Sequence, residues 1–278
     1  MTILITGARG AVGQSVLAGL IDAGIPAADL RAASSDPQHA AVPVGVTTVA
    51  ARLTDTAALT AALDGVDQVF LYAPLSDAGP VTTALRNSSV KHVVVLSAAA
   101  IDEPEGGVLG TANRAAEGAV ADTGVTMTAL RPGAFTTNAL GWADAIRASR
   151  TVSTPYPDSH TLPIHPDDVA DAAVAVLTGQ ADRGEAITLT GPQSLSFRDQ
   201  VGILAQVVGL KLDLIELTPE EGRARMTGMP GPVADTLVAL WAAADGRPRP
   251  VHDVTRITGR PARTFGQWVR ENKSVFTS

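Results

Sequence analysis

The fold is decided by residues 2–13, which read TILITGARGAVG. Residues 2–6 form a short apolar, β-branched run of the kind that becomes a buried strand. The chain then turns through three glycines into a segment in which Val12, Val16 and Leu20 recur at helical spacing. Strand, glycine-rich turn and helix therefore follow one another without a gap.

The three glycines have separate roles in such a turn. Gly7 permits the tight backbone bend, Gly10 lets the backbone approach a pyrophosphate, and Gly13 lets the helix pack closely on the strand. The phosphate charge then lies on the exposed amides of the helix N-terminus. The segment predicts a nicotinamide dinucleotide site in a Rossmann domain. The expected cofactor contacts here are Thr6, Gly7, Arg9, Gly10, Ala11, Val12 and Gly13.

Strand and helix patterns alternate along the chain, which is typical of a doubly wound sheet. Strands are expected at residues 30–34, 46–50, 68–73, 92–97, 126–130, 186–189 and 212–217. Helices are expected from the Thr54-Asp55 cap to Leu63 and at 111–123, 167–178, 197–208, 220–226, 233–244 and 264–272. The fold class is α/β, a Rossmann doubly wound parallel sheet with a small C-terminal α/β cap. Residues 1–150 are expected to form the NAD(P)-binding domain, whose sheet receives later strands, and residues 151–278 the smaller substrate-binding cap.

The composition excludes several kinds of function. The 278 residues carry a net charge of -7 and no cluster of Lys and Arg that would follow nucleic-acid phosphates. Cysteine is absent, so disulfides, thiolate zinc sites and cysteine nucleophiles are excluded. No uncharged apolar stretch reaches the roughly 18 residues of a membrane helix, and residues 1–6 lack the flanks of a signal peptide. We expect a cytoplasmic monomer or homodimer with a small-molecule substrate and no nucleic-acid or membrane partner.

The end of the second expected strand distinguishes NADPH from NADH. An acidic residue there would bind the ribose 2′-hydroxyl of NADH, but Ser34 and Ser35 occupy the position. Arg9 in the glycine turn is placed to meet a 2′-phosphate, and Arg31 is a weaker candidate. Asp36, just beyond the two serines, argues for NADH. The pattern favours NADPH, with NADH as the alternative.

Further segments carry a family resemblance. They are Thr6 to Gly13, Asp64 to Phe70, Val95 to Ser97, Glu117, Asp122 to Val125, Leu130 to Phe135 with Asn138, Ile164 to Ala170 and Leu189 to Pro192. In these segments the chain resembles the NmrA-like family of atypical short-chain dehydrogenases/reductases, especially its NAD(P)H:quinone oxidoreductase-like members. The likeness spans nearly the whole chain, and the Arg-Pro-Gly-Ala-Phe segment is its more specific part.

The resemblance implies the rest of the cofactor site. Ala73 and Pro74 would line the adenosine, and Ser97 takes the position of the family's catalytic Ser or Thr beside the nicotinamide. The family commonly has Gly-Asp-Leu after the third strand, where this chain has Ala51, Arg52 and Leu53. Arg52 would stack on the adenine rather than accept from its amino group. The residues expected to wrap the nicotinamide are Pro132, Gly133, Ala134 and Phe135.

The usual acid–base pair of short-chain dehydrogenases, a Tyr four residues before a Lys, is missing. The chain has two tyrosines, Tyr72 and Tyr156, which are followed at that spacing by Ser76 and His160. In the matching helix the pair falls on Leu109 and Asn113. The expected catalytic residues are instead Ser97, Asn113, Tyr156 and His160, with Tyr72 as a further candidate acid. For Tyr156 the alternative is a loop aromatic between two prolines, and for His160 a structural histidine.

No metal site is expected. Asp167, Asp168 and Asp171 lie at the start of an expected helix, where carboxylates favour the helix dipole. We interpret them as capping residues, with His165 joining the cap.

These observations favour an NAD(P)H-dependent oxidoreductase that passes hydride to a small apolar, conjugated acceptor of the quinone or enone kind. One alternative is an NAD(P)-binding redox sensor or regulatory protein without catalysis, which the missing Tyr and Lys favour. Another is a biosynthetic enzyme that retains the cofactor for a non-redox role.

Overall fold

A seven-stranded parallel sheet forms the centre of the molecule. The computed structural model describes residues 1–73, 76–252 and 254–277, except for the side chain of His39. The strand order is β3-β2-β1-β4-β5-β6-β9. The strands are β1 (Ile3–Ile5), β2 (Leu30–Ser34), β3 (Thr47–Ala50), β4 (Gln68–Tyr72), β5 (His92–Leu96), β6 (Thr126–Pro132) and β9 (Ala186–Leu189). This order confirms the predicted doubly wound fold, because the chain crosses over at β1.

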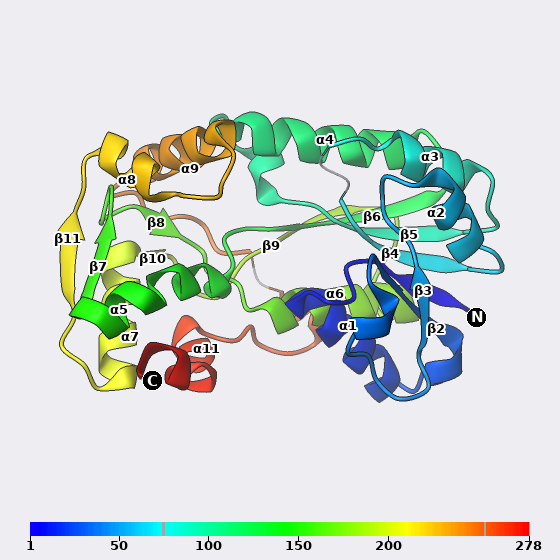
Figure 1. Cartoon of the computed structure of the whole chain (residues 1–278), viewed down its shortest axis with the longest axis horizontal. Coiled ribbons are helices and arrows are strands. Elements are labelled where there is room, and N and C mark those ends of the chain that lie inside the picture. The colour runs from blue at the N-terminus through cyan, green and yellow to red at the C-terminus, as the bar shows by residue number, and fades with distance from the viewer. Residues whose placement is uncertain (74–75, 253, 278) are drawn as a thin grey trace.

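Helices cover both faces of the sheet, as Figure 1 shows. One face packs on α1 (Ala11–Asp22) and α6 (Pro166–Thr178), and the other on α2 (Thr56–Ala62), α3 (Gly79–Arg86) and α4 (Gly107–Ala121). Strand β5 contributes to the hydrophobic core on each face of the sheet. Val94 and Leu96 pack in the core under α1 and α6, and Val93 and Val95 pack in the core under α2, α3 and α4. This two-sided burial confirms the prediction for the run at residues 93–96.

The later part of the chain builds a second unit around its own core. It lies at the end of the sheet away from the N-terminus, toward which the carboxyl ends of the strands point (Figure 1). Its core joins α5 (Ala143–Ser149), α7 (Phe197–Val208) and α11 (Phe265–Glu271). The remaining elements are β7 (Thr151–Thr154), β8 (His160–Thr161), β10 (Leu195–Ser196), β11 (Asp213–Glu216), α8 (Pro219–Arg225), α9 (Gly231–Ala243), α10 (Thr255–Thr258) and α12 (Lys273–Thr277).

Some elements differ from the prediction. Helix α3 was not expected, because it has only eight residues and begins with Gly79 and Pro80. The short strands β7, β8 and β10 were not expected either, since two to four residues carry no readable alternation. Strand β9 and helix α6 lie beyond residue 150, but β9 belongs to the sheet and α6 packs on it. The division of the chain into two domains at residue 150 stays a prediction. In the part of the chain that the structure describes, no helix is long and apolar enough to cross a bilayer.

His92 makes the stability of the sheet dependent on pH. The imidazole lies at the amino end of β5, where its Nδ1 is 3.1 Å from Gln68 Oε1 and its Nε2 is 2.9 Å from Thr128 Oγ1. Burial lowers the pKa of His92 to about 4. Between pH 6.5 and 4 the unfolded chain therefore binds a proton that the folded chain does not bind.

We expect the free energy of unfolding to fall by about 3 kcal/mol as the pH drops through this window, because protonation favours the unfolded state. In His92→Gln, whose amide does not titrate, this part of the slope should disappear. Chemical denaturation of both proteins at several pH values measures it. Equal slopes would show that His92 is not the titrating group.

Candidate active site

The glycine turn presents the N-terminus of α1 at the carboxyl end of the sheet. Gly7 has a φ of +63°, which suits glycine, and a Cβ at Gly13 would lie 2.4 Å from the Gly7 carbonyl oxygen. Both positions therefore require glycine for the fold itself. Gly10 is different, because its φ is -81° and a Cβ would meet the same oxygen at an ordinary 3.4 Å. The fold does not explain the glycine at position 10, whereas close approach of a ligand does.

Helix α1 begins with free donors. The N-cap residue, Gly10, has no side chain to cap the helix, and the first turn holds no acidic residue. The first amides of a helix lack partners within it and carry partial positive charge. The turn therefore fits the diphosphate of a dinucleotide.

The residues expected to contact the adenosine lie beside this turn. Arg9 is exposed and its guanidinium forms no hydrogen bond or ion pair with the described residues, and Arg52 is also exposed. Ser34 is buried and its Oγ accepts from the Asp36 amide at 3.0 Å, whereas Ser35 is exposed. Leu53 and Ala73 pack in the core under α2 and α3, and Pro74 lies outside the described residues.

Arg31 does not belong to this site. Its Nη1 donates to the carbonyl oxygens of Ala62 and Asp64 at 3.1 and 2.6 Å. The side chain thus holds the end of α2 against β2, and the suggestion that it meets a 2′-phosphate was wrong.

Ser97 lies directly after β5 and is buried. Its amide donates to the Leu130 carbonyl at 2.8 Å, but its Oγ has no partner among the described residues. A buried hydroxyl without a partner costs free energy, and a ligand beside Ser97 would complete its hydrogen bonds. The observation fits a cofactor or substrate beside Ser97.

The segment Gly133 to Thr136 follows β6, the strand whose Leu130 carbonyl accepts from the Ser97 amide. Gly133 donates its amide to Leu189 at 3.0 Å, and Phe135 pairs with Ile164 in an isolated bridge. Thr136 comes next, and its buried Oγ1 also lacks a partner in the described part of the chain. Thr136 was not predicted, because the residues expected to wrap the nicotinamide ended at Phe135.

Asn113 is buried on α4, and its Nδ2 donates to the Leu109 carbonyl at 2.9 Å. One of its two amide hydrogens is thus already used within the helix. The other hydrogen and the side-chain oxygen are left for a ligand.

Tyr156 and His160 lie in the second unit, formed by the later part of the chain. Tyr156 has a φ of +53°, and its carbonyl accepts from the Ser159 amide in a turn between β7 and β8. The Nδ1 of His160 is 3.2 Å from Ser194 Oγ, and its amide donates to Ala244. No hydrogen bond within residues 1–73, 76–252 and 254–277 joins either side chain to Ser97.

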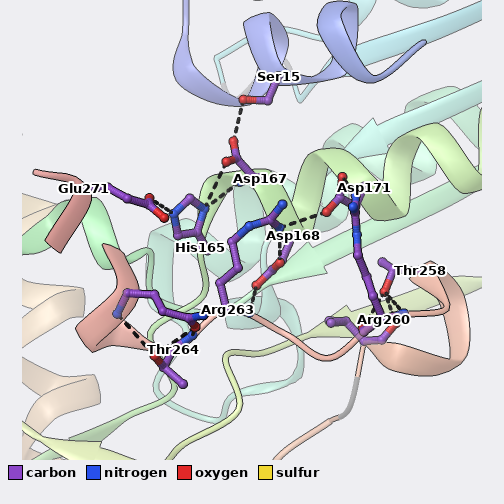
Figure 2. Close-up of polar contacts among 12 residues, drawn as sticks. Ser15, His165, Asp167, Asp168, Asp171, Thr258, Arg260, Arg263, Thr264 and Glu271 are labelled. Atoms are coloured by element: carbon purple, nitrogen blue, oxygen red, sulfur yellow. Dashed lines mark hydrogen bonds and ion pairs between the residues drawn. The ribbon is translucent and has the colours of Figure 1, made fainter. Parts of the chain in front are cut away.

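A polar network holds the start of α6, as Figure 2 shows. The His165 Nδ1 accepts from the Asp167 amide at 3.1 Å, which confirms it as the helix cap, and its Nε2 is 2.9 Å from Glu271. Asp168 lies in the first turn of α6 as predicted, whereas Asp171 lies beyond it, and Arg263 from the C-terminal segment binds both carboxylates. Burial raises the pKa of Asp168, and the contacts with Arg263 oppose this.

This network anchors the C-terminal segment. Arg260 pairs with Asp171, so the segment is tied to α6, and Ser15 of α1 donates to Asp167 at 2.7 Å, which joins α6 to α1. Every carboxylate of the network is engaged by a side chain. Among the residues described, no group of acidic and histidine side chains could hold a metal ion.

Fold and glycine turn together define a Rossmann protein that binds a dinucleotide. A family model described as NAD(P)H-binding matches residues 7–180. The chain therefore belongs to this NAD(P)H-binding family, which confirms the predicted cofactor class.

Relatives narrow the class further. The chain is 38% identical to (4-alkanoyl-5-oxo-2,5-dihydrofuran-3-yl)methyl phosphate reductase of Streptomyces griseus, over 99% of both proteins. It is 32% identical to NAD(P)H azoreductase of Xenophilus azovorans, again over 99% of both. It is also 26% identical to the NADPH-dependent quinone oxidoreductase of Escherichia coli in its NADPH complex. That comparison has a TM-score of 0.84 and covers 98% of this chain and 99% of the other. These likenesses agree with the resemblance to the NmrA-like family and confirm the predicted class, an NAD(P)H-dependent oxidoreductase.

Proposed function

We propose that the protein is an NADPH-dependent reductase of small, apolar, conjugated acceptors of the quinone or enone kind. The observation that carries the proposal is the buried hydroxyl of Ser97, which has no partner in the described part of the chain, in a sequence without the Tyr and Lys pair. The cofactor, when bound, supplies the hydride. The protein has to position the acceptor and stabilise the negative charge that develops on it.

The missing acid favours a conjugated acceptor. Reduction of an isolated ketone creates an alkoxide, for which a positioned acid is typically worth about 10²–10⁴ in rate. Leu109 and Asn113 stand where that acid and its partner would be. A conjugated acceptor spreads the charge over several atoms, so a hydrogen bond from Ser97 can stabilise it while water provides the proton.

The relatives support this chemistry. The substrate named for the Streptomyces griseus reductase is a methyl phosphate on a 5-oxo-2,5-dihydrofuran ring with an alkanoyl group. Its ring double bond is conjugated with carbonyl groups, so this relative supports the conjugated character of the acceptor, although its phosphate group is not apolar. The azoreductase and the quinone oxidoreductase also have conjugated acceptors by name. The proposal is tested by comparing NADPH oxidation with an enone and with the matching saturated ketone. Equal rates would overturn it.

The glycine turn would bind the diphosphate, and Pro132 to Phe135 would wrap the nicotinamide. Ser97 and Thr136 offer buried hydroxyls there, and Asn113 offers its remaining amide hydrogen. Tyr156 and His160 are retained as candidate proton donors from the cap. If the wild type bound NADPH but oxidised it with no acceptor, a sensor role would be favoured instead. A cytoplasmic location and a monomeric or dimeric state stay predictions.

NADPH should bind more tightly than NADH for two reasons. Arg9 is exposed without a hydrogen-bond or ion-pair partner among the described residues, and the end of β2 carries Ser34 and Ser35 instead of the acid that would bind the ribose 2′-hydroxyl of NADH. A charge-assisted bond to phosphate is worth about 1.5–3 kcal/mol. Arg9→Ala should therefore weaken NADPH binding roughly ten-fold or more in calorimetric titration and leave NADH nearly unchanged. Arg225→Ala, in an exposed position of α8, is the control. Equal losses for both cofactors would show that Arg9 does not contact the 2′-phosphate.

A further inference from the structure

Ile101, Asp102 and Glu103, a short way after Ser97 in the chain, are each bound by a different arginine. The first two end a 3₁₀ turn, Ala99–Asp102, and Glu103 follows it. The arginines come from α4, from β6 and from the cap. The pairs are Arg114 with the Ile101 carbonyl, Arg131 with the Asp102 carboxylate and Arg249 with the Glu103 carboxylate.

Arg131 has the most extensive contacts of the three. Its Nε and Nη2 donate to the two carboxylate oxygens of Glu117 at 3.0 and 2.7 Å. Its Nη1 donates to both oxygens of Asp102 at 3.1 and 3.3 Å. The side chain of Glu117 is 10% exposed and that of Arg131 19%, so this fork is shielded from water far more than a surface ion pair. The contact with Glu117 raises the pKa of Arg131, so its charge is permanent.

The same arginine lies next to the backbone bond that holds Ser97. The Ser97 amide donates to the Leu130 carbonyl, which belongs to the peptide bond joining Leu130 to Arg131. The segment 97–102 is thus tied to the end of β6 at both ends, by this backbone bond and by the side chain of Arg131. No partner among the described residues fixes the Ser97 hydroxyl, so the placement of its backbone decides where the hydroxyl lies.

We infer that Arg131 is a positioning residue, which Glu117 orients and which sets the place of the Ser97 hydroxyl through Asp102. The inference rests on the proposed function, because it assigns a role to Ser97 in turnover. Arg131 itself does not touch the substrate, since its Nε and both Nη atoms are taken up by carboxylates. Lysine cannot replace it, because an ammonium group lacks the planar fork that binds two carboxylates at once.

A double-mutant cycle with Ser97→Ala tests the inference. Arg131→Lys alone should lower kcat about ten-fold with an enone acceptor and leave the NADPH dissociation constant within about three-fold of wild type. In the Ser97→Ala background the same substitution should change kcat by less than about two-fold, because the group that it positions is already gone. Arg223→Lys, which alters an exposed ion pair with Asp235 between α8 and α9, is the matched control and should not change kcat.

Asp102→Asn is the second variant, should Arg131→Lys fail to fold. Its side chain is half exposed, and the pair of Arg131 with Glu117 remains intact. It should lower kcat in wild type but not in Ser97→Ala. Additive losses in the cycle, or no loss in either variant, would overturn the inference and leave the proposed function standing. A wild type that turns over no acceptor would overturn the proposed function and this inference with it.

Discussion

Gly10→Asp is expected to abolish NADPH binding while leaving the protein at least as stable as wild type. Position 10 is the N-cap of α1, where aspartate is among the best residues, and a side chain there meets only ordinary contacts. The same carboxylate would face the diphosphate of the cofactor. We expect affinity to fall at least about 100-fold, which corresponds to roughly 3 kcal/mol. Calorimetric titration and thermal unfolding measure the two effects.

Two glycine variants serve as controls. Gly13→Ala should show the opposite stability effect, because its Cβ would overlap the Gly7 carbonyl and displace α1. Gly118→Asp adds the same charge at an open, exposed position of α4 and should bind NADPH normally. Wild-type affinity in Gly10→Asp would mean that the diphosphate binds elsewhere.

Ser97→Ala is expected to lower kcat with a conjugated acceptor by roughly 10–100-fold, because the loss of one donor to the developing charge costs this much or more. Affinity for NADPH should stay close to wild type. Stability should not fall, since the hydroxyl that is removed has no partner among the described residues. Steady-state kinetics and cofactor titration measure these effects.

Ser159→Ala is the matched control. Ser159 is also buried, and its hydroxyl likewise lacks a described partner, but its backbone pairs with Asp245 and Phe197 in the cap. It should keep wild-type kcat. An unchanged kcat in Ser97→Ala would show that Ser97 does not stabilise the developing charge and would move that role to Tyr156 or His160.

The sequence predicts the parts of this molecule that depend on short-range patterns. The glycine turn, strand β9 and helix α7 lie where the pattern places them, because each needs only local signals: glycines, β-branched residues or helical spacing with a terminal glycine. The capping role of His165 was also readable, since the residue directly precedes its helix.

The rest depends on partners that are distant in the sequence. The first-turn position of Asp168 could be predicted, but its contact with Arg263, some 95 positions later, could not. The fork of Arg131 joins two acids 14 and 29 positions away, a pairing that no spacing rule indicates. Arg31 resembled a phosphate ligand because only the structure shows that the end of α2 uses its donors. The family resemblance predicted that Ser97 lies beside the nicotinamide. Only the structure shows that its hydroxyl has no partner among the described residues.

The most direct test of the account follows deuterium from NADPH labelled at both C4 positions into the product of an enone. The account predicts deuterium on the carbon β to the carbonyl group, with a proton from water on the α carbon, as judged by NMR of the product. Deuterium on the carbonyl carbon, or no transfer to the enone while NADPH binds, would contradict it.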